Sequence, residues 1–218
     1  VDFVGTVDAA GFGLQGLTVN AGSGPVTFGN AVGSGQALAS LAVTGPTVLD
    51  GNVTTTGAQT YNSGVTLGNS VTLATSGNAV DFLGTVDATA AGAQGLTVSA
   101  GAGLVTFTGT VGGAQALASL TATGPTTLDS NVTTIGAQTY NSAVTLGNSI
   151  ILATNDNTVA FTATVDATAA GDQGLTISAG TGTVSFGGNV GGSQALASLD
   201  VTGPTTLDGN VTSIGTQT

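Results

Sequence analysis

Aspartate is the only residue type in this chain that could supply acid, base or ion-binding chemistry through a charge. The 218 residues include 11 Asp and no Glu, Lys, Arg, His or Cys. Carboxylates at a suitable spacing act as general acids and bases or as calcium ligands. Six of the aspartates fall into two series in which neighbours are 79 residues apart, namely Asp8, Asp87 and Asp166, and Asp50, Asp129 and Asp208.

The 79-residue spacing argues against a shared carboxylate site. In a chain that stacks as coils we expect equivalent aspartates to lie three coils, about 14 Å, apart. Calcium binds oxygen at about 2.4 Å, so one ion cannot join them. Asp50-Gly51-Asn52 and Asp208-Gly209-Asn210 have the composition of turns. We predict turn residues, with no catalytic, metal or cofactor site, and we expect chelation to leave folding unchanged.

Three other motifs have a functional and a structural interpretation. Asn155-Asp156-Asn157 is the densest group of oxygen ligands, but its counterpart Ser76-Gly77-Asn78 lacks the Asp. Residues 11–16, GFGLQG, match the dinucleotide motif G-x-G-x-x-G, yet a strand-like Leu-Thr-Val follows where that motif needs a helix. We interpret 11–16 as a turn. Asn52, Asn131 and Asn210 begin N-glycosylation sequons, which we interpret first as polar faces of strands.

The composition excludes several function classes. A chain with a net charge of −11 and no cation cannot neutralise phosphates or dock on anionic lipid, so no nucleic-acid partner is expected. Apolar runs are too short to insert in a membrane. Catalysis would rest on Asp, Ser, Thr and Tyr alone, and we therefore predict that the protein is not an enzyme.

Repetition organises the whole chain. Residues 36–60 return as 115–139 and 194–218 with 18 of 25 positions identical in all three. We divide the chain into copies 1–79, 80–158 and a shorter 159–218, all within one continuous segment, 1–218. Because the repeat begins and stops in mid-pattern, we expect a segment of something longer, whose coils continue through a longer chain or through end-to-end association of subunits.

Within each copy, short Val- and Thr-rich runs alternate inward and outward residues and end at Gly, Asn or Asp, which is typical of strands. Coils of 20–25 residues with three short strands each predict an all-β fold, a right-handed parallel β-helix (β-solenoid) with about three coils per repeat. Residues 149–158 are expected to add an extra strand. Eight or nine coils would form a rod roughly 40 Å long. The large side chains predicted to be buried are Phe3, Phe28, Leu49, Phe82, Phe107, Leu128, Phe161, Phe186 and Leu207.

Two other structures are compatible with parts of the sequence. A propeller blade of about 40 residues would fit half a repeat, but the two halves of the repeat do not match each other. The segment QALASL at 36–41, 115–120 and 194–199 favours helix by propensity. It is only six residues long between glycine-rich turns, so we predict a strand with a bend near Ser40, Ser119 and Ser198.

Strings such as VTF-x-G-x-V, QGLTVSAG and TTLD-x-NVTT-x-GAQTYN resemble the tandem β-strand repeats of filamentous-haemagglutinin-like and autotransporter-type giant bacterial exoproteins. The resemblance covers the whole chain. It implies a right-handed parallel β-helix at the bacterial cell surface or in the extracellular space, acting as a stalk, filament or adhesin. Ligand binding stays open as the alternative, either to surface glycans or to ice through Thr rows at Thr54-Thr55-Thr56, Thr133-Thr134 and Thr212.

Overall fold

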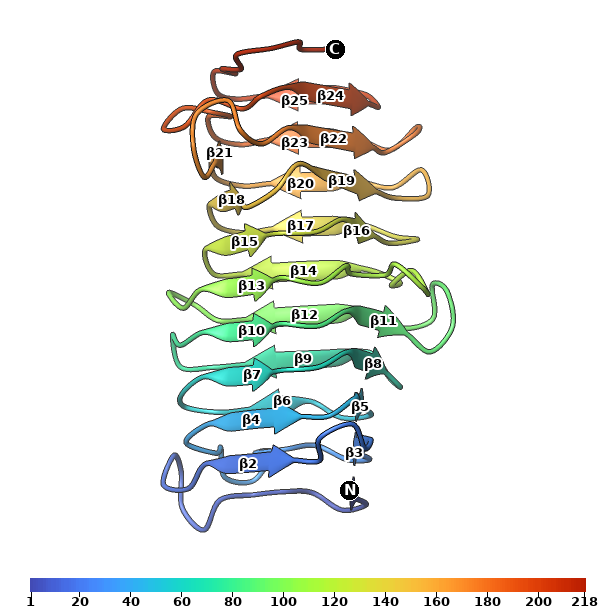
Figure 1. The fold of residues 1–218 in the computed structure, drawn as a ribbon, viewed down its shortest axis with the longest axis vertical. Coiled ribbons are helices and arrows are strands. Elements are labelled where there is room, and N and C mark those ends of the chain that lie inside the picture. Colours follow the sequence, from blue (N-terminus) through green and yellow to red (C-terminus); the bar gives the residue numbers. More distant parts are fainter.

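The chain winds into one long parallel β-helix (Figure 1). The structure is a computed structural model that covers residues 1–218. It contains 25 strands and no helix, and therefore no helix of the length and hydrophobicity that a membrane span requires. Every strand pair and every isolated bridge is parallel, and the coils number about 10. The predicted fold class is confirmed, with slightly more coils than the eight or nine expected.

Three faces run along the rod, and each coil contributes one strand segment to each face. The first face consists of β1 (Asp2–Phe3), β3 (Val26–Phe28), β5 (Thr47–Leu49), β8 (Val65–Leu67), β11 (Val86–Ala88), β16 (Val132–Thr133), β19 (Ile150–Ala153), β22 (Leu175–Ser178) and β24 (Leu199–Thr202). Its two halves are joined through Val111, which bridges Val86 and Val132.

The other two faces are uninterrupted ladders of eight strands. The second face consists of β2 (Leu17–Asn20), β4 (Leu41–Thr44), β7 (Gln59–Tyr61), β10 (Val80–Phe82), β13 (Val105–Phe107), β15 (Thr126–Leu128), β18 (Val144–Leu146) and β21 (Val165–Ala167). The third face consists of β6 (Val53–Thr54), β9 (Val71–Ala74), β12 (Leu96–Ser99), β14 (Leu120–Thr123), β17 (Gln138–Tyr140), β20 (Val159–Phe161), β23 (Val184–Phe186) and β25 (Thr205–Leu207).

One repeat is not a whole number of coils. The copy from Val80 to Thr158 contains the ten strands β10 to β19 and the single bridge at Val111, eleven segments in all. With three segments per coil, a repeat makes 3⅔ coils, which refines the expected figure of about three. The strand expected within 149–158 is β19, a regular member of the first face. Because 3⅔ is not a whole number of coils, equivalent residues of successive copies lie on different faces.

Aromatic stacking follows this displacement from face to face. Phe3 stacks on Phe28 on the first face, with ring centroids 4.9 Å apart. The second copy places the equivalent pair, Phe82 and Phe107, on the second face beside Tyr61 of the first copy. The third copy places Phe161 and Phe186 on the third face beside Tyr140 of the second copy. Each face therefore carries one aromatic column at a different height along the rod.

The interior is a single apolar core of 47 buried residues that runs through the stacked coils. Of the nine large side chains predicted to be buried, seven are: Phe28, Leu49, Phe82, Phe107, Leu128, Phe161 and Phe186. Phe3 is half-buried and packs against the core. The prediction is wrong for Leu207, which is 51% exposed in the last coil of residues 1–218.

Corners of the coils depend on glycine where the backbone turns sharply. Gly112 has φ +68°, and a Cβ there would collide with the Thr133 carbonyl of the next coil. Gly33 and Gly191, its equivalents, have φ +71° and +67°. The segment QALASL is not helical, as predicted, but the predicted strand over 115–119 is wrong, because these residues form no regular ladder with the neighbouring coils. Its central Leu117 forms one bridge to Thr134, and the regular strand β14 begins only at Leu120, just after the expected bend.

Candidate functional site

The first aspartate series caps loops of the following coil. Asp87 Oδ1 accepts hydrogen bonds from the main-chain N–H groups of Ala114 (2.8 Å) and Gln115 (3.1 Å). Asp8 and Asp166 make the same pair of bonds one copy earlier and later. The N–H groups of Gln36 and Gly35 lower the pKa of Asp8 from its ordinary value, because they stabilise the charged carboxylate. The carboxylates of this series therefore hold loops of the neighbouring coil in place.

The second series ties neighbouring coils together at turns. The Asn69 amide donates to the main-chain oxygen of Asp50 (2.9 Å), and Asn148 does the same for Asp129 (2.8 Å). Asp50, Asp129 and Asp208 follow β5, β15 and β25, which lie on three different faces. Equivalent carboxylates therefore do not line up, and no group of three acidic residues that could hold a metal ion is present. The effect of chelation stays a prediction.

The Asn155-Asp156-Asn157 cluster is a tight turn. Asp156 has φ +57° and stands where the preceding copy has Gly77, with φ +77°. Its Oδ1 accepts a hydrogen bond from the main-chain N–H of Thr181 (2.8 Å). Asn157 donates to the main-chain oxygens of Ile135 and Asn155. The side chains of Asp156 and Asn157 are thus engaged in joining neighbouring coils.

The dinucleotide-like motif is a turn, as predicted. Residues 11–16 form no helix, and the strand β2 follows directly at Leu17. The three sequon asparagines are exposed, and Val53 and Val132 are buried beside them as expected, whereas Val211 is half-buried. Asn52 and Asn131 also use Oδ1 to accept the N–H of Thr72 and of Ile151 in the next coil, both at 2.8 Å. Glycosylation stays a prediction.

The Thr residues suggested as an ice-binding row do not form one. Thr54, Thr133 and Thr212 lie on the third, first and second faces, and Thr55 and Thr134 are buried. A different row exists: Thr72, Thr97, Thr121 and Thr139 pair in register on the third face. One repeat later, the same positions are Ile151, Thr176, Asp200 and Thr218. The row is therefore not a property of the repeat.

A buried polar cluster recurs inside the rod. Gln138 Nε2 donates to the oxygens of Val132, Thr134 and Ala153, and Gln138 Oε1 accepts from the Tyr140 hydroxyl (3.2 Å). Gln59 and Tyr61 repeat the arrangement on the second face. Burial raises the pKa of both tyrosines far above its usual range, so the hydroxyls stay protonated and donate. No buried side-chain polar atom is left unpaired.

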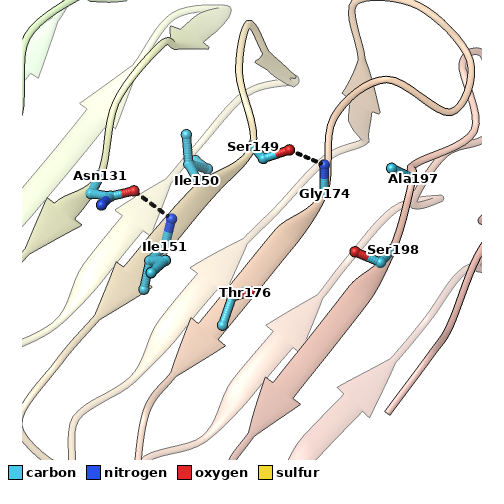
Figure 2. A pocket seen from close by; sticks show the side chains of 8 residues that line it. All are labelled: Asn131, Ser149, Ile150, Ile151, Gly174, Thr176, Ala197 and Ser198. Carbon is cyan, nitrogen blue, oxygen red and sulfur yellow. Dashed lines mark hydrogen bonds between the residues drawn. The ribbon is translucent and has the colours of Figure 1, made fainter.

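The chain's candidate binding sites are two shallow grooves at equivalent positions of successive repeats. The upper groove, between Asn131 and Ser198 on the first face, has a volume of about 350 Å³ (Figure 2). The lower groove, between Ser70 and Ser119 on the third face, has a volume of about 170 Å³. Each groove lies at the N-terminal ends of three neighbouring strands. These are β19, β22 and β24 for the upper groove and β9, β12 and β14 for the lower.

Hydrogen bonds between coils hold the walls of each groove. In the upper groove, Asn131 accepts from the Ile151 N–H and Ser149 Oγ accepts from the Gly174 N–H at 2.9 Å (Figure 2). The Ser70 hydroxyl accepts from Gly95 in the lower groove at 3.0 Å. The outward wall differs, since Ile151 of the upper groove is Thr72 in the lower. The larger groove is thus the more apolar one.

Sequence reasoning missed both the polar cluster and the grooves. The recurring Thr-x-x-x-Gln-x-Tyr pattern, with Gln and Tyr both at inward positions, could have indicated the cluster. The grooves depend on neighbours 20–25 residues away, whose register the sequence did not reveal. No protein-family model, curated protein or solved structure matches this chain.

Proposed function

We propose that this chain is a rigid structural segment of a bacterial extracellular fibre, filament or adhesin stalk. The observation that carries the proposal is the continuity of the core across copies: each 79-residue copy adds 3⅔ coils to one uninterrupted core. Any number of further copies would extend the rod without a joint, because the same inward residues stack again. A spacer needs such an element of adjustable length.

The surface chemistry supports an extracellular setting. The absence of Lys and Arg leaves no cleavage site for trypsin-like proteases. A net charge of −11 keeps parallel rods apart, which favours growth along the axis over sideways aggregation. The resemblance to tandem repeats of giant bacterial exoproteins points to the same setting. Lengthening occurs through more copies in one chain or through end-to-end stacking of subunits.

A length series tests the rod. Proteins with two, four and six copies should increase in maximum dimension by about 18 Å per copy in small-angle X-ray scattering, since coils lie about 4.8 Å apart. A dimension that levels off, or that varies with hinge-like disorder between copies, would contradict a jointless rod. Immunogold labelling of the source cells tests the location, and label confined to the cytoplasm would remove the surface role.

Ice binding is the second candidate, and one observation favours it: the four-coil Thr row on the third face has no charged residue in its strands. Its interruption by Asp200 in the next copy counts against it. Measurement of thermal hysteresis in the purified protein separates the two, because a passive rod leaves the freezing point at its colligative value.

A further inference from the structure

The three faces of the rod differ in the charge on their outward side chains. The first face carries Asp2, Asp87 and Asp200 at outward strand positions, and the second face carries Asp81 and Asp166. The third face has no charged residue in any of its eight strands. The net charge of −11 is therefore distributed unevenly around the rod axis.

The uncharged face is also built from small side chains in register. From β9 onward its outward residues align in one column, which consists of Thr72, Thr97, Thr121, Thr139, Ala160, Ser185 and Thr206. A second column beside it consists of Thr54, Ala74, Ser99 and Thr123. None of these side chains is larger than that of Thr. Sheets with small, in-register side chains of this kind pack closely against one another and exclude water.

The chemistry of the columns fits an identical partner. A Thr side chain offers a methyl group and a hydroxyl that both donates and accepts, so a column can meet a copy of itself with every group matched. Two rods that approached through the first or second face would bring like charges together, which is unfavourable. At the third face the nearest carboxylates include Asp50, Asp156 and Asp208, which lie in turns beyond the ends of the strands. Contact between the strands of two third faces therefore buries no charge.

We propose that the third face is a contact surface for a second copy of this chain, and that two rods pair side by side through it. Eight strands spaced about 4.8 Å apart and about 13 Å long present about 500 Å² on each rod. The pair buries about 1,000 Å² in total, the lower limit of specific interfaces, so the dimer is weak and forms at high protein concentration. A two-fold pairing occupies the uncharged face of both rods and leaves the charged faces outward, so it stops at two rods. The inference does not depend on the fibre role, since a rod that stays single still acts as a spacer.

Analytical ultracentrifugation tests the proposal. We expect the purified protein to change from monomer to dimer between about 10 µM and about 1 mM. The dimer should be tighter at about 1 M NaCl than at about 0.1 M, because salt screens the repulsion between two negative rods. A protein that stays monomeric at every concentration and salt overturns the proposal. If that monomer also lowered the freezing point beyond its colligative value, the face would bind ice rather than a second rod.

A pair of variants with matched charge locates the contact. Thr97→Asp combined with Thr121→Asp places two carboxylates side by side on the third face and should weaken the dimer at least about tenfold. Thr106→Asp combined with Thr127→Asp adds the same charge in register on β13 and β15 of the second face and should change the affinity less than about twofold. The fold accepts an outward Asp in a strand, as Asp81 in β10 shows. Equal weakening by both variants would mean that net charge and not the third face controls association. A dimer unchanged by the third-face variant would form through another surface, and either result overturns the proposal.

Discussion

The two sides of a single strand differ in how strictly the repeat retains them. At the inward positions of β10 and β20, Phe82 and Phe161 are equivalent, and both are buried. Between the inward residues, outward Asp81 becomes Ala160. The contrast recurs in β14 and β24, where Leu120 and Leu199 match and Thr121 becomes Asp200. Stacking of coil on coil constrains the interior, whereas an outward side chain varies unless it has a specific contact.

Replacement of an inward aromatic residue should give the largest effect. Phe107→Ala removes a fully buried ring that stacks on Phe82 at 5.1 Å and should lower the free energy of unfolding by about 3–5 kcal/mol. The outward control, Thr106→Ala on the same strand, should cost less than about 1 kcal/mol. Chemical denaturation measures both. Similar losses in the two variants would remove the distinction between the sides.

The inward polar cluster should give an intermediate effect. Gln138→Leu fills the space but removes the acceptor of the Tyr140 hydroxyl and one hydrogen bond each to the main-chain oxygens of Val132 and Ala153, which should cost about 1–3 kcal/mol. Thr139→Val, the outward neighbour on β17, is the control. If Gln138→Leu raised the free energy of unfolding measured by chemical denaturation, the polar cluster would destabilise the rod rather than support it.

The outward loop caps should give the smallest effect, and it should depend on pH. Hydrogen bonds from Gln36 and Gly35 lower the pKa of Asp8, so its contribution to stability is present above the ordinary Asp range, about pH 3.9, and is lost as pH falls through the lower folded pKa. The amide shifts of Gly35 and Gln36 should titrate in that acidic window. Asp8→Asn keeps an oxygen acceptor and removes the charge, so the titration should disappear; a transition that persisted would have another origin.

The interior was largely predictable from sequence, because alternation of period two marks inward residues locally. The number of coils per repeat was harder to predict. Val111 contributes a single bridge where other segments form strands, so a count of strand-like runs loses one segment of the eleven. Ten segments would make 3⅓ coils instead of 3⅔ and would assign equivalent residues to the wrong faces, so the register that forms the grooves could not be derived.

Because a repeat makes 3⅔ coils, the number of copies sets the rotational orientation of one end of the rod relative to the other. Adding or deleting one copy rotates the end of the rod about its axis by a third of a revolution. A group attached at that end would rotate with it. Only a change of three copies, 11 coils, restores the original heading. Gain or loss of a single repeat therefore changes both the length of the rod and the orientation of its end about the rod axis. A partner that binds from one side would meet a different face.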